Sequence, residues 1–145
     1  AITTLAFVTL YEDGDRSFTF ARKPGADLLL TDEDIDENIE NIRNCKLFHA
    51  GSLSLSQDPC RTSMKKAIKA AKEAGKIISF DINYRDAVWD DENACLNEVN
   101  DILPYVDLLK ISDEELFFVG GEENIPTFMK ENHITVLIFI HVFRL

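Results

Sequence analysis

Polar and charged side chains follow an apolar run of the sequence, and their types suit the binding of hydroxyl and anionic groups. The run from Ile77 to Ile82 is typical of a buried strand, and Asp81, Asn83 and Arg85 occupy alternating positions at its end. If the backbone stays extended there, the three side chains project from one face. Arg supplies a rigid fork of donors, while Asp and Asn supply acceptors, so the set suits a polyol beside an anion. The alternative is an Asp81 to Arg85 ion pair that only holds the loop.

A second group of such residues follows the next predicted strand, Val106 to Ile111. Lys110, a strand-end cation beside a predicted helix N-terminus, favours an anion cradle. Glu115 suits a Mg²⁺ ion that keeps several of its waters. Ser112 and Glu115 also have the spacing of a capping box, which explains both residues without any ligand. Both interpretations stay open.

A third candidate is the turn Gly51-Ser52-Leu53-Ser54, which follows the predicted strand Lys46 to Ala50. Its small residues allow the backbone to approach a ligand closely, although an ordinary strand-to-helix turn has the same composition. Because ligands of α/β sheets bind beyond the carboxyl ends of the strands, all three candidates are expected near one another.

The elements that must position these residues form an α/β pattern, in which strands and helices alternate from Lys46 onward. Such repeats predict a parallel sheet with helices on both faces. Thr31 is expected to open a helix carrying Ile35, Ile39 and Ile42 on one face. A further strand is predicted from Thr135 to Ile140. Further helices are predicted at Pro59 to Ala74 (capped by Asp58 and ended by Gly75), Asp91 to Leu103, Ser112 to Val119 (closed by Gly120-Gly121) and Ile125 to Glu131.

The amino-terminal residues predict a β-hairpin. Two β-rich runs, Thr3 to Leu10 and Arg16 to Arg22, flank the turn Glu12-Asp13-Gly14-Asp15. Alternation places Phe18, Phe20 and Arg22 on one face of the second strand. Because an isolated hairpin is marginally stable in water, this one must cover or pair with another surface.

Charge and composition exclude several classes of function. The 145 residues carry a formal net charge of -11 without a basic cluster, which argues against nucleic acid or a membrane surface as partner. The three cysteines lie far apart and are expected to be reduced thiols, and the three histidines are expected to be ordinary packing or surface residues. With no basic leader and no long apolar run, the sequence predicts a soluble cytoplasmic protein.

The chain resembles the ribokinase-like (pfkB) carbohydrate kinases, most closely the fructokinase branch. The similar segments, in the family's order, are Thr3 to Val8, Arg16 to Phe20 with Arg22 and Pro24-Gly25-Ala26-Asp27, Gly51 to Leu55, Asp81 to Arg85 with Trp89, and Lys110 to Glu115. The resemblance implies a ribokinase-like sheet with a β-hairpin lid, with residues 1–30 as the lid and its return and residues 31–145 as a partial α/β core.

The resemblance also implies an activity: phosphoryl transfer from ATP, with Mg²⁺, to a sugar hydroxyl, as in the conversion of fructose to fructose 6-phosphate. The residues implied to bind the sugar are Phe20, Arg22, Asn83 and Arg85. Lys110 and Ser112 are implied to lie near the nucleotide phosphates, and Glu115 to hold the metal through water. Ser112 stands where many relatives have Asn, and Ala21 where a Tyr often precedes the Arg.

The family's catalytic Asp belongs to a G-A-G-D motif, which the 145 residues lack. We therefore expect the chain to represent the central part of a kinase and, by itself, to be inactive. The alternatives are a non-catalytic α/β binding module or truncated product, and a nucleoside kinase of the same superfamily. Whether two copies pair through the hairpin is left open.

Overall fold

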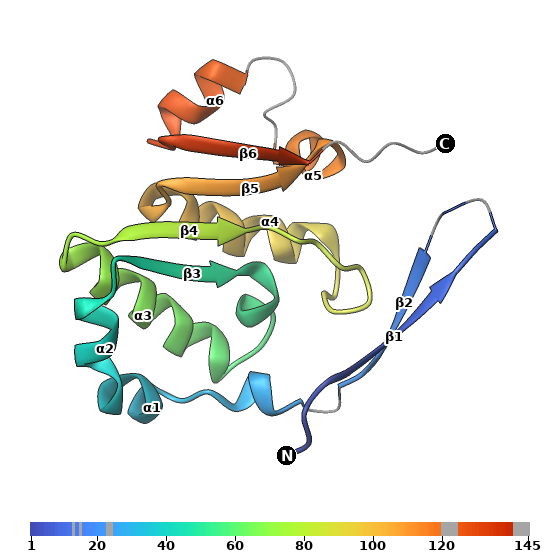
Figure 1. The fold of residues 1–145 in the computed structure, drawn as a ribbon, viewed down its shortest axis with the longest axis horizontal. Helices are drawn as coiled ribbons and strands as arrows, with labels where there is room; N and C mark the ends of the chain where they lie inside the picture. Colours follow the sequence, from blue (N-terminus) through green and yellow to red (C-terminus); the bar gives the residue numbers. More distant parts are fainter. Residues whose placement is uncertain (13, 15, 23–24, 120–124, 141–145) are drawn as a thin grey trace.

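A computed structural model describes residues 1–12, 14, 16–22, 25–119 and 125–140 (Figure 1). The hairpin consists of β1 (Leu5–Leu10) and β2 (Arg16–Ala21). The sheet consists of β3 (Leu47–Gly51), β4 (Ile77–Asp81), β5 (Leu108–Ser112) and β6 (Val136–Ile140). The α-helices are α1 (Asp32–Glu37), α2 (Ile39–Asn44), α3 (Cys60–Glu73), α4 (Glu92–Ile102), α5 (Asp113–Phe118) and α6 (Ile125–Glu131). Short 3₁₀ helices are η1 (Ala26–Leu29), η2 (Ser52–Leu55) and η3 (Leu103–Tyr105).

The predicted hairpin is confirmed, and Figure 1 shows it projecting away from the sheet. The antiparallel register pairs Ala6 with Phe20 and Val8 with Phe18, so the two rings share one face of β2 as alternation predicts. Gly14, at φ +86°, belongs to the connecting turn, whose residues Asp13 and Asp15 lie outside the described part of the chain.

The four predicted parallel strands are also confirmed, and they are ordered β3-β4-β5-β6. Each strand lies within one or two residues of its predicted bounds. The register pairs Gly51 with Asp81 and Asp81 with Lys110, so the carboxyl ends of three neighbouring strands meet at the same level of the sheet. The α/β class and the meeting of the strand ends at one edge of the sheet are therefore as the sequence predicts.

One face of this sheet carries the core. Buried residues of the strands, such as Ile78, Phe80 and Leu109, pack with the buried stripes of α3 and α4. These two helices lie side by side, joined by an ion pair between Lys65 Nζ and Glu98 Oε2 at 2.6 Å.

The sequence predicts helices on both faces of the sheet. Because the strand order does not reverse, right-handed crossovers bring the connecting helices of the described residues to one face. The opposite face exposes the apolar residues Leu47, Ile77, Val136 and Ile138.

Two helix predictions need correction. The helix predicted to begin at Thr31 does so with a capping box to Asp34, but it is interrupted at Asn38 into α1 and α2. The Asn38 side chain donates to the Asp34 carbonyl at 2.9 Å, and such bonds compete with a continuous helix. Helix α3 begins at Cys60, one residue later than predicted, and Asp58 nevertheless accepts the Thr62 N–H at 3.3 Å.

The end of α3 is as predicted. Gly75 follows it at φ +72°, a left-handed backbone that favours glycine, and its N–H donates to the Lys72 carbonyl at 2.9 Å. The predicted closure of α5 by Gly120-Gly121 lies outside the described residues, as do His141 to Leu145. Among the described residues, the helices are too short or too polar to span a bilayer.

Candidate functional site

A cavity of about 270 Å³ opens at the carboxyl ends of β3 and β4. This is the edge of the sheet where the sequence places the candidate residues, and it is the edge where α/β sheets bind ligands. The residues that line the cavity come from η1, β3, η2 and the end of β4, and they are Asp27, His49, Gly51, Ser52, Leu53, Ser54, Asp81 and Asn83.

The wall formed by the turn after β3 is held by internal hydrogen bonds. The buried Ser52 hydroxyl donates to the Ile82 carbonyl, and the Ser54 hydroxyl donates to the Gly51 carbonyl at 2.7 Å. A Cβ on Gly51 would lie 3.3 Å from the Asp81 carbonyl oxygen, so a glycine allows the two strand ends to approach. The turn therefore shapes the cavity and also packs the strand ends together.

Asp81 pairs with Lys110 and not with Arg85. Asp81 and Lys110 occupy paired positions on β4 and β5, and the Lys110 ammonium donates to the Asp81 carboxylate. The predicted alternative of an Asp81 to Arg85 ion pair is therefore wrong. The Lys110 side chain keeps 38% of its surface exposed, so its ammonium remains accessible to an anion.

The backbone after β4 is not extended as the sequence analysis assumed. Asn83 has φ +41°, in the left-handed region that asparagine tolerates better than most residues. Because of this turn, Asn83 lines the cavity beside Asp81, whereas Arg85 is not among the residues that line it. The expectation that Asp81, Asn83 and Arg85 share one extended face therefore fails at Asn83.

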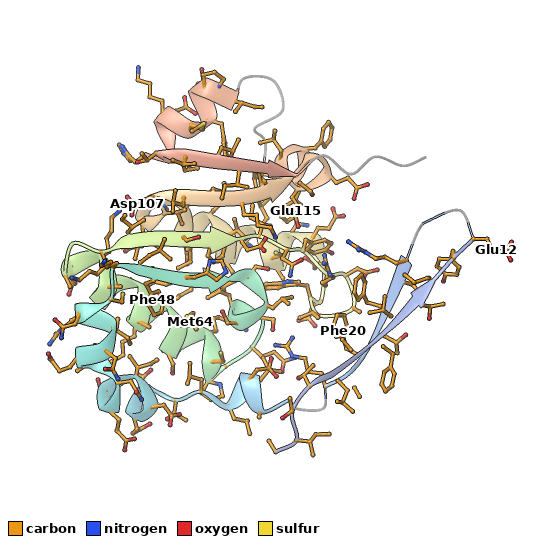
Figure 2. All side chains as sticks on the ribbon, in the orientation of Figure 1. Glu12, Phe20, Phe48, Met64, Asp107 and Glu115 are labelled. Carbon is orange, nitrogen blue, oxygen red and sulfur yellow. The ribbon has the colours of Figure 1, made fainter. Side chains whose placement is uncertain are left out.

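Arg85 reaches the hairpin. Its Nη1 donates to the Tyr84 carbonyl at 2.6 Å, and its Cζ lies 5.3 Å from the centroid of the Phe18 ring. Phe18 in turn stacks on Phe20, with ring centroids 6.2 Å apart. Figure 2 shows Phe20 on the side of the hairpin that faces the loop after β4. The guanidinium and the two rings thus join the hairpin to the loop that bears Asn83.

Arg22 lies at the base of the hairpin, with 9% of its side chain exposed. Its Nη2 donates to Asp27 Oδ2 at 2.6 Å and lies 3.2 Å from the Leu53 carbonyl oxygen. Burial raises the pKa of the Asp27 carboxyl, but hydrogen bonds from Thr4 and Arg22 outweigh it and hold that pKa below its ordinary value of 3.8. The structure therefore gives Arg22 a partner within the chain.

Ser112 and Glu115 form the capping box that the spacing indicates. The Ser112 hydroxyl accepts the Glu115 N–H at 3.2 Å, and Glu115 Oε2 accepts the Ser112 N–H at 2.9 Å. The sequence did not indicate the third bond, in which the Tyr84 N–H donates to Glu115 Oε1 at 2.7 Å. Glu115 thereby ties the loop after β4 to the start of α5.

A hydrated Mg²⁺ fits this arrangement only through water. Each Glu115 oxygen accepts one backbone N–H, and each retains a lone pair for a metal-bound water. The described residues contain no group of three or more Asp, Glu, His or Cys side chains able to hold a metal directly.

The sequence analysis missed His49 as a cavity residue. His49 lies on β3 opposite Ser79 of β4, and its Nδ1 is 3.1 Å from the Ser79 hydroxyl oxygen. Alternation along β3 places His49 on the same face as Gly51, two residues later, and this was the signal available.

Comparison with known proteins places the chain beside one group of enzymes. The model of the pfkB family of carbohydrate kinases matches residues 1–138. Probable fructokinase-2 of Arabidopsis thaliana is 44% identical over 125 residues, which are 86% of this chain and 37% of the relative. Fructokinase-1 of Zea mays is 42% identical over 125 residues, 86% of this chain and 38% of the relative. The chain thus spans less than two fifths of the length of these relatives.

Solved structures give the same result. A fructokinase from Xylella fastidiosa matches with a TM-score of 0.75 and 28% identity, covering 97% of this chain and 44% of that one. A fructokinase from Vibrio cholerae, solved with fructose, ADP and calcium, matches with a TM-score of 0.73 and 30% identity, covering 92% of this chain and 44% of that one.

Proposed function

The chain belongs to the pfkB family of carbohydrate kinases, and we propose that it forms the sugar-binding cavity and hairpin lid of an ATP-dependent fructokinase. The reaction would transfer the terminal phosphoryl group of ATP to fructose, giving fructose 6-phosphate. The observation that carries this proposal is the cavity walled by Asp81 and Asn83, beside a loop that the hairpin contacts through Arg85 and Phe18.

The sugar side of the site would use the cavity residues. The Asn83 amide offers both a donor and an acceptor to sugar hydroxyls, and the Asp81 carboxylate offers acceptors. Phe18 and Phe20 would cover the sugar from the hairpin, since their rings share the face that meets Arg85. Arg22 would act from the hairpin base, where its bond to Asp27 already fixes it.

The phosphate side of the site would lie at the ends of β4 and β5. Lys110 would bind nucleotide phosphates, because its side chain is partly exposed and lies two residues before Ser112, which caps α5. When bound, Mg²⁺ would neutralise phosphate charge, and Glu115 would hold one of its waters through a free lone pair. Arg85 would approach the transferred phosphoryl group from the boundary of hairpin and loop.

Phosphoryl transfer depends on positioning and charge stabilisation, and these residues supply part of both. We assign the catalytic base to none of the 145 residues, because the sequence contains no G-A-G-D motif. The 145-residue chain should therefore turn over no ATP by itself. In this proposal residues 1–30 are the lid and its return, residues 31–145 are the partial core, and the enzyme works in the cytoplasm.

Pairing of two hairpins is part of the proposal. The hairpin face opposite Phe18 and Phe20 leaves Leu5 52% and Phe7 59% exposed, and exposed apolar patches of this kind mark interaction surfaces. Sedimentation of the chain and of a Phe7→Ser variant tests it. A wild-type dimer that dissociates on substitution supports pairing, and a monomeric wild type contradicts it.

A chimera tests the proposed activity. Residues 1–138 would replace the matching segment of a plant fructokinase, and fructose-dependent ADP release would be measured. We expect turnover with fructose, which Arg85→Ala abolishes without a comparable loss of stability. Arg43→Ala is the matched control, because Arg43 is exposed and its ion-pair partner within the described ranges is Glu40 of its own helix. A chimera that folds but phosphorylates no fructose contradicts the proposal.

A further inference from the structure

Both ends of the hairpin converge on a single carboxylate. Thr4, which immediately precedes β1, donates from its hydroxyl to Asp27 Oδ1 at 2.6 Å. Arg22, which immediately follows β2, donates to Asp27 Oδ2 from Nε at 3.0 Å and from Nη2 at 2.6 Å. The two oxygens of Asp27 therefore hold the two strands of the hairpin at their base, one strand each.

The backbone around Asp27 is shaped to allow this arrangement. A Cβ added to Gly25 would lie 1.9 Å from Thr4 Oγ1 and 2.3 Å from Asp27 Oδ1, so only glycine leaves room for the bond between them. Ile2 forms an isolated parallel bridge with Gly25, and the Ala26 N–H donates to the Ile2 carbonyl at 2.9 Å. The segment before β1 and the segment after β2 are thus joined by backbone as well as by side chains.

The same network continues into the wall of the cavity. Arg22 Nη2 lies 3.2 Å from the Leu53 carbonyl oxygen in η2, and both Leu53 and Asp27 line the cavity. The base of the hairpin and the turn after β3 are therefore one hydrogen-bonded unit. A second link between the hairpin and the core lies away from this base, where Arg85 contacts the ring of Phe18.

We propose that Asp27 is a positioning residue, which fixes the hairpin over the cavity by holding Thr4 and Arg22 together. Both of its oxygens accept from donors of the hairpin base, and the role we assign to Asp27 is to place the rings of Phe18 and Phe20 through these bonds. The expected effect of Asp27 on fructose binding rests on the proposed function. The expected effect of Asp27 on how firmly the hairpin is held does not depend on that function.

Two measurements on the 145-residue chain test this role separately. Hydrogen exchange of the β1 and β2 amides, compared with those of α3 and β4, reports without any ligand how firmly the hairpin is held. Titration with fructose, followed by nuclear magnetic resonance, reports on sugar binding. The variants are Asp27→Asn, which removes the charge that binds Arg22, and Thr4→Val, which removes the hydroxyl. Thr4→Ser keeps the hydroxyl and is the conservative control.

We expect Asp27→Asn to speed exchange in the hairpin by about tenfold or more while the core amides stay within about twofold of wild type, since charge-assisted bonds are lost at one place only. Thr4→Val should have a smaller effect of the same kind, Thr4→Ser little effect, and Asp27→Asn should weaken fructose binding several-fold. Unchanged exchange in the hairpin, or equal acceleration in hairpin and core, overturns the proposal.

The two arms also separate this proposal from the proposed function. Faster exchange in the hairpin of Asp27→Asn with unchanged fructose affinity overturns the positioning role in sugar binding. A wild-type chain that binds no fructose contradicts the proposed function, and the exchange data then decide on the hairpin alone.

Discussion

Asp81 and Lys110 face each other across the neighbouring parallel strands β4 and β5, and their ion pair stands at the edge of the cavity. Asp81 lines the cavity, while Lys110 lies two residues before Ser112, the residue that caps α5. One pair of charges therefore connects the proposed sugar site with the proposed phosphate site. Substitutions of single residues can therefore test the phosphate site and the sugar site separately.

Lys110→Met should weaken ATP binding by about tenfold or more, because a charge-assisted bond to phosphate is lost. It should also destabilise the fold by about 1 kcal/mol, because the half-buried Asp81 loses its partner, and the partial exposure of the pair limits this cost. Calorimetric titration with ATP and urea unfolding measure the two effects. Lys110→Arg keeps the charge and is the control. Unchanged ATP affinity in Lys110→Met would count against the phosphate role.

A pair of substitutions at Asn83 can separate the effect of its backbone conformation on stability from the effect of its side-chain amide on sugar binding. Asn83→Gly suits φ +41°, whereas Asn83→Ala keeps the Cβ but loses the polar side chain that lets asparagine tolerate the left-handed region, at a cost of about 1 kcal/mol relative to glycine. Both variants lose the amide that we assign to the sugar. We expect Asn83→Ala to be the less stable in urea unfolding and both to lose fructose affinity. If Asn83→Gly binds fructose like wild type, the amide has no role in binding.

The capping box at the start of α5 predicts energetic coupling between Ser112 and Glu115. Glu115→Gln should cost about 1–2 kcal/mol, because an amide NH₂ replaces one acceptor of the Tyr84 and Ser112 N–H groups. Ser112→Ala should cost about 1 kcal/mol. The double variant should lose less than the sum, since each residue bonds the other. Additive losses in urea unfolding would show that the two bonds are independent.

The three cysteines should differ sharply in reactivity. Cys95 is fully buried, and burial raises the pKa of its thiol to about 12, so almost no reactive thiolate forms at pH 8. Burial likewise raises the pKa of Cys60, whereas Cys45 is only half-buried. Brief alkylation of the folded chain, followed by intact mass measurement, should give one label, and alkylation in denaturant should give three. Rapid labelling of Cys60 or Cys95 in the folded chain would contradict this packing.

Local patterns were sufficient to predict the elements and the edge of the sheet where the candidates meet. Alternation predicted that Phe18 and Phe20 share one face of β2, and the carboxyl ends of the strands lie together because parallel strands all end at the same edge. The spacing of Ser112 and Glu115 was enough to predict a capping box, since all of its partners lie within four residues.

Partners far apart in the sequence could not be predicted in the same way. The choice of Lys110 as partner of Asp81 depends on the register between β4 and β5, which no local pattern encodes. The bond from Tyr84 to Glu115 depends on where two loops meet in space. The left-handed turn at Asn83 broke the assumed alternation, and it redirected Arg85 from the cavity to the hairpin. Side-chain direction after a strand end is therefore less predictable than the strand itself.

Titration of the isotope-labelled chain with fructose tests the central claim most directly, with the side-chain amide signals of Asn83 as the readout and glucose as the comparison sugar. Our account predicts a saturable shift of the Asn83 signals. It also predicts shifts of Phe18 and Phe20 that are lost in Asn83→Gly. Fructose that leaves these signals unmoved, or that shifts residues of the cavity at the opposite edge of the sheet, such as Lys72 and Thr135, would contradict it.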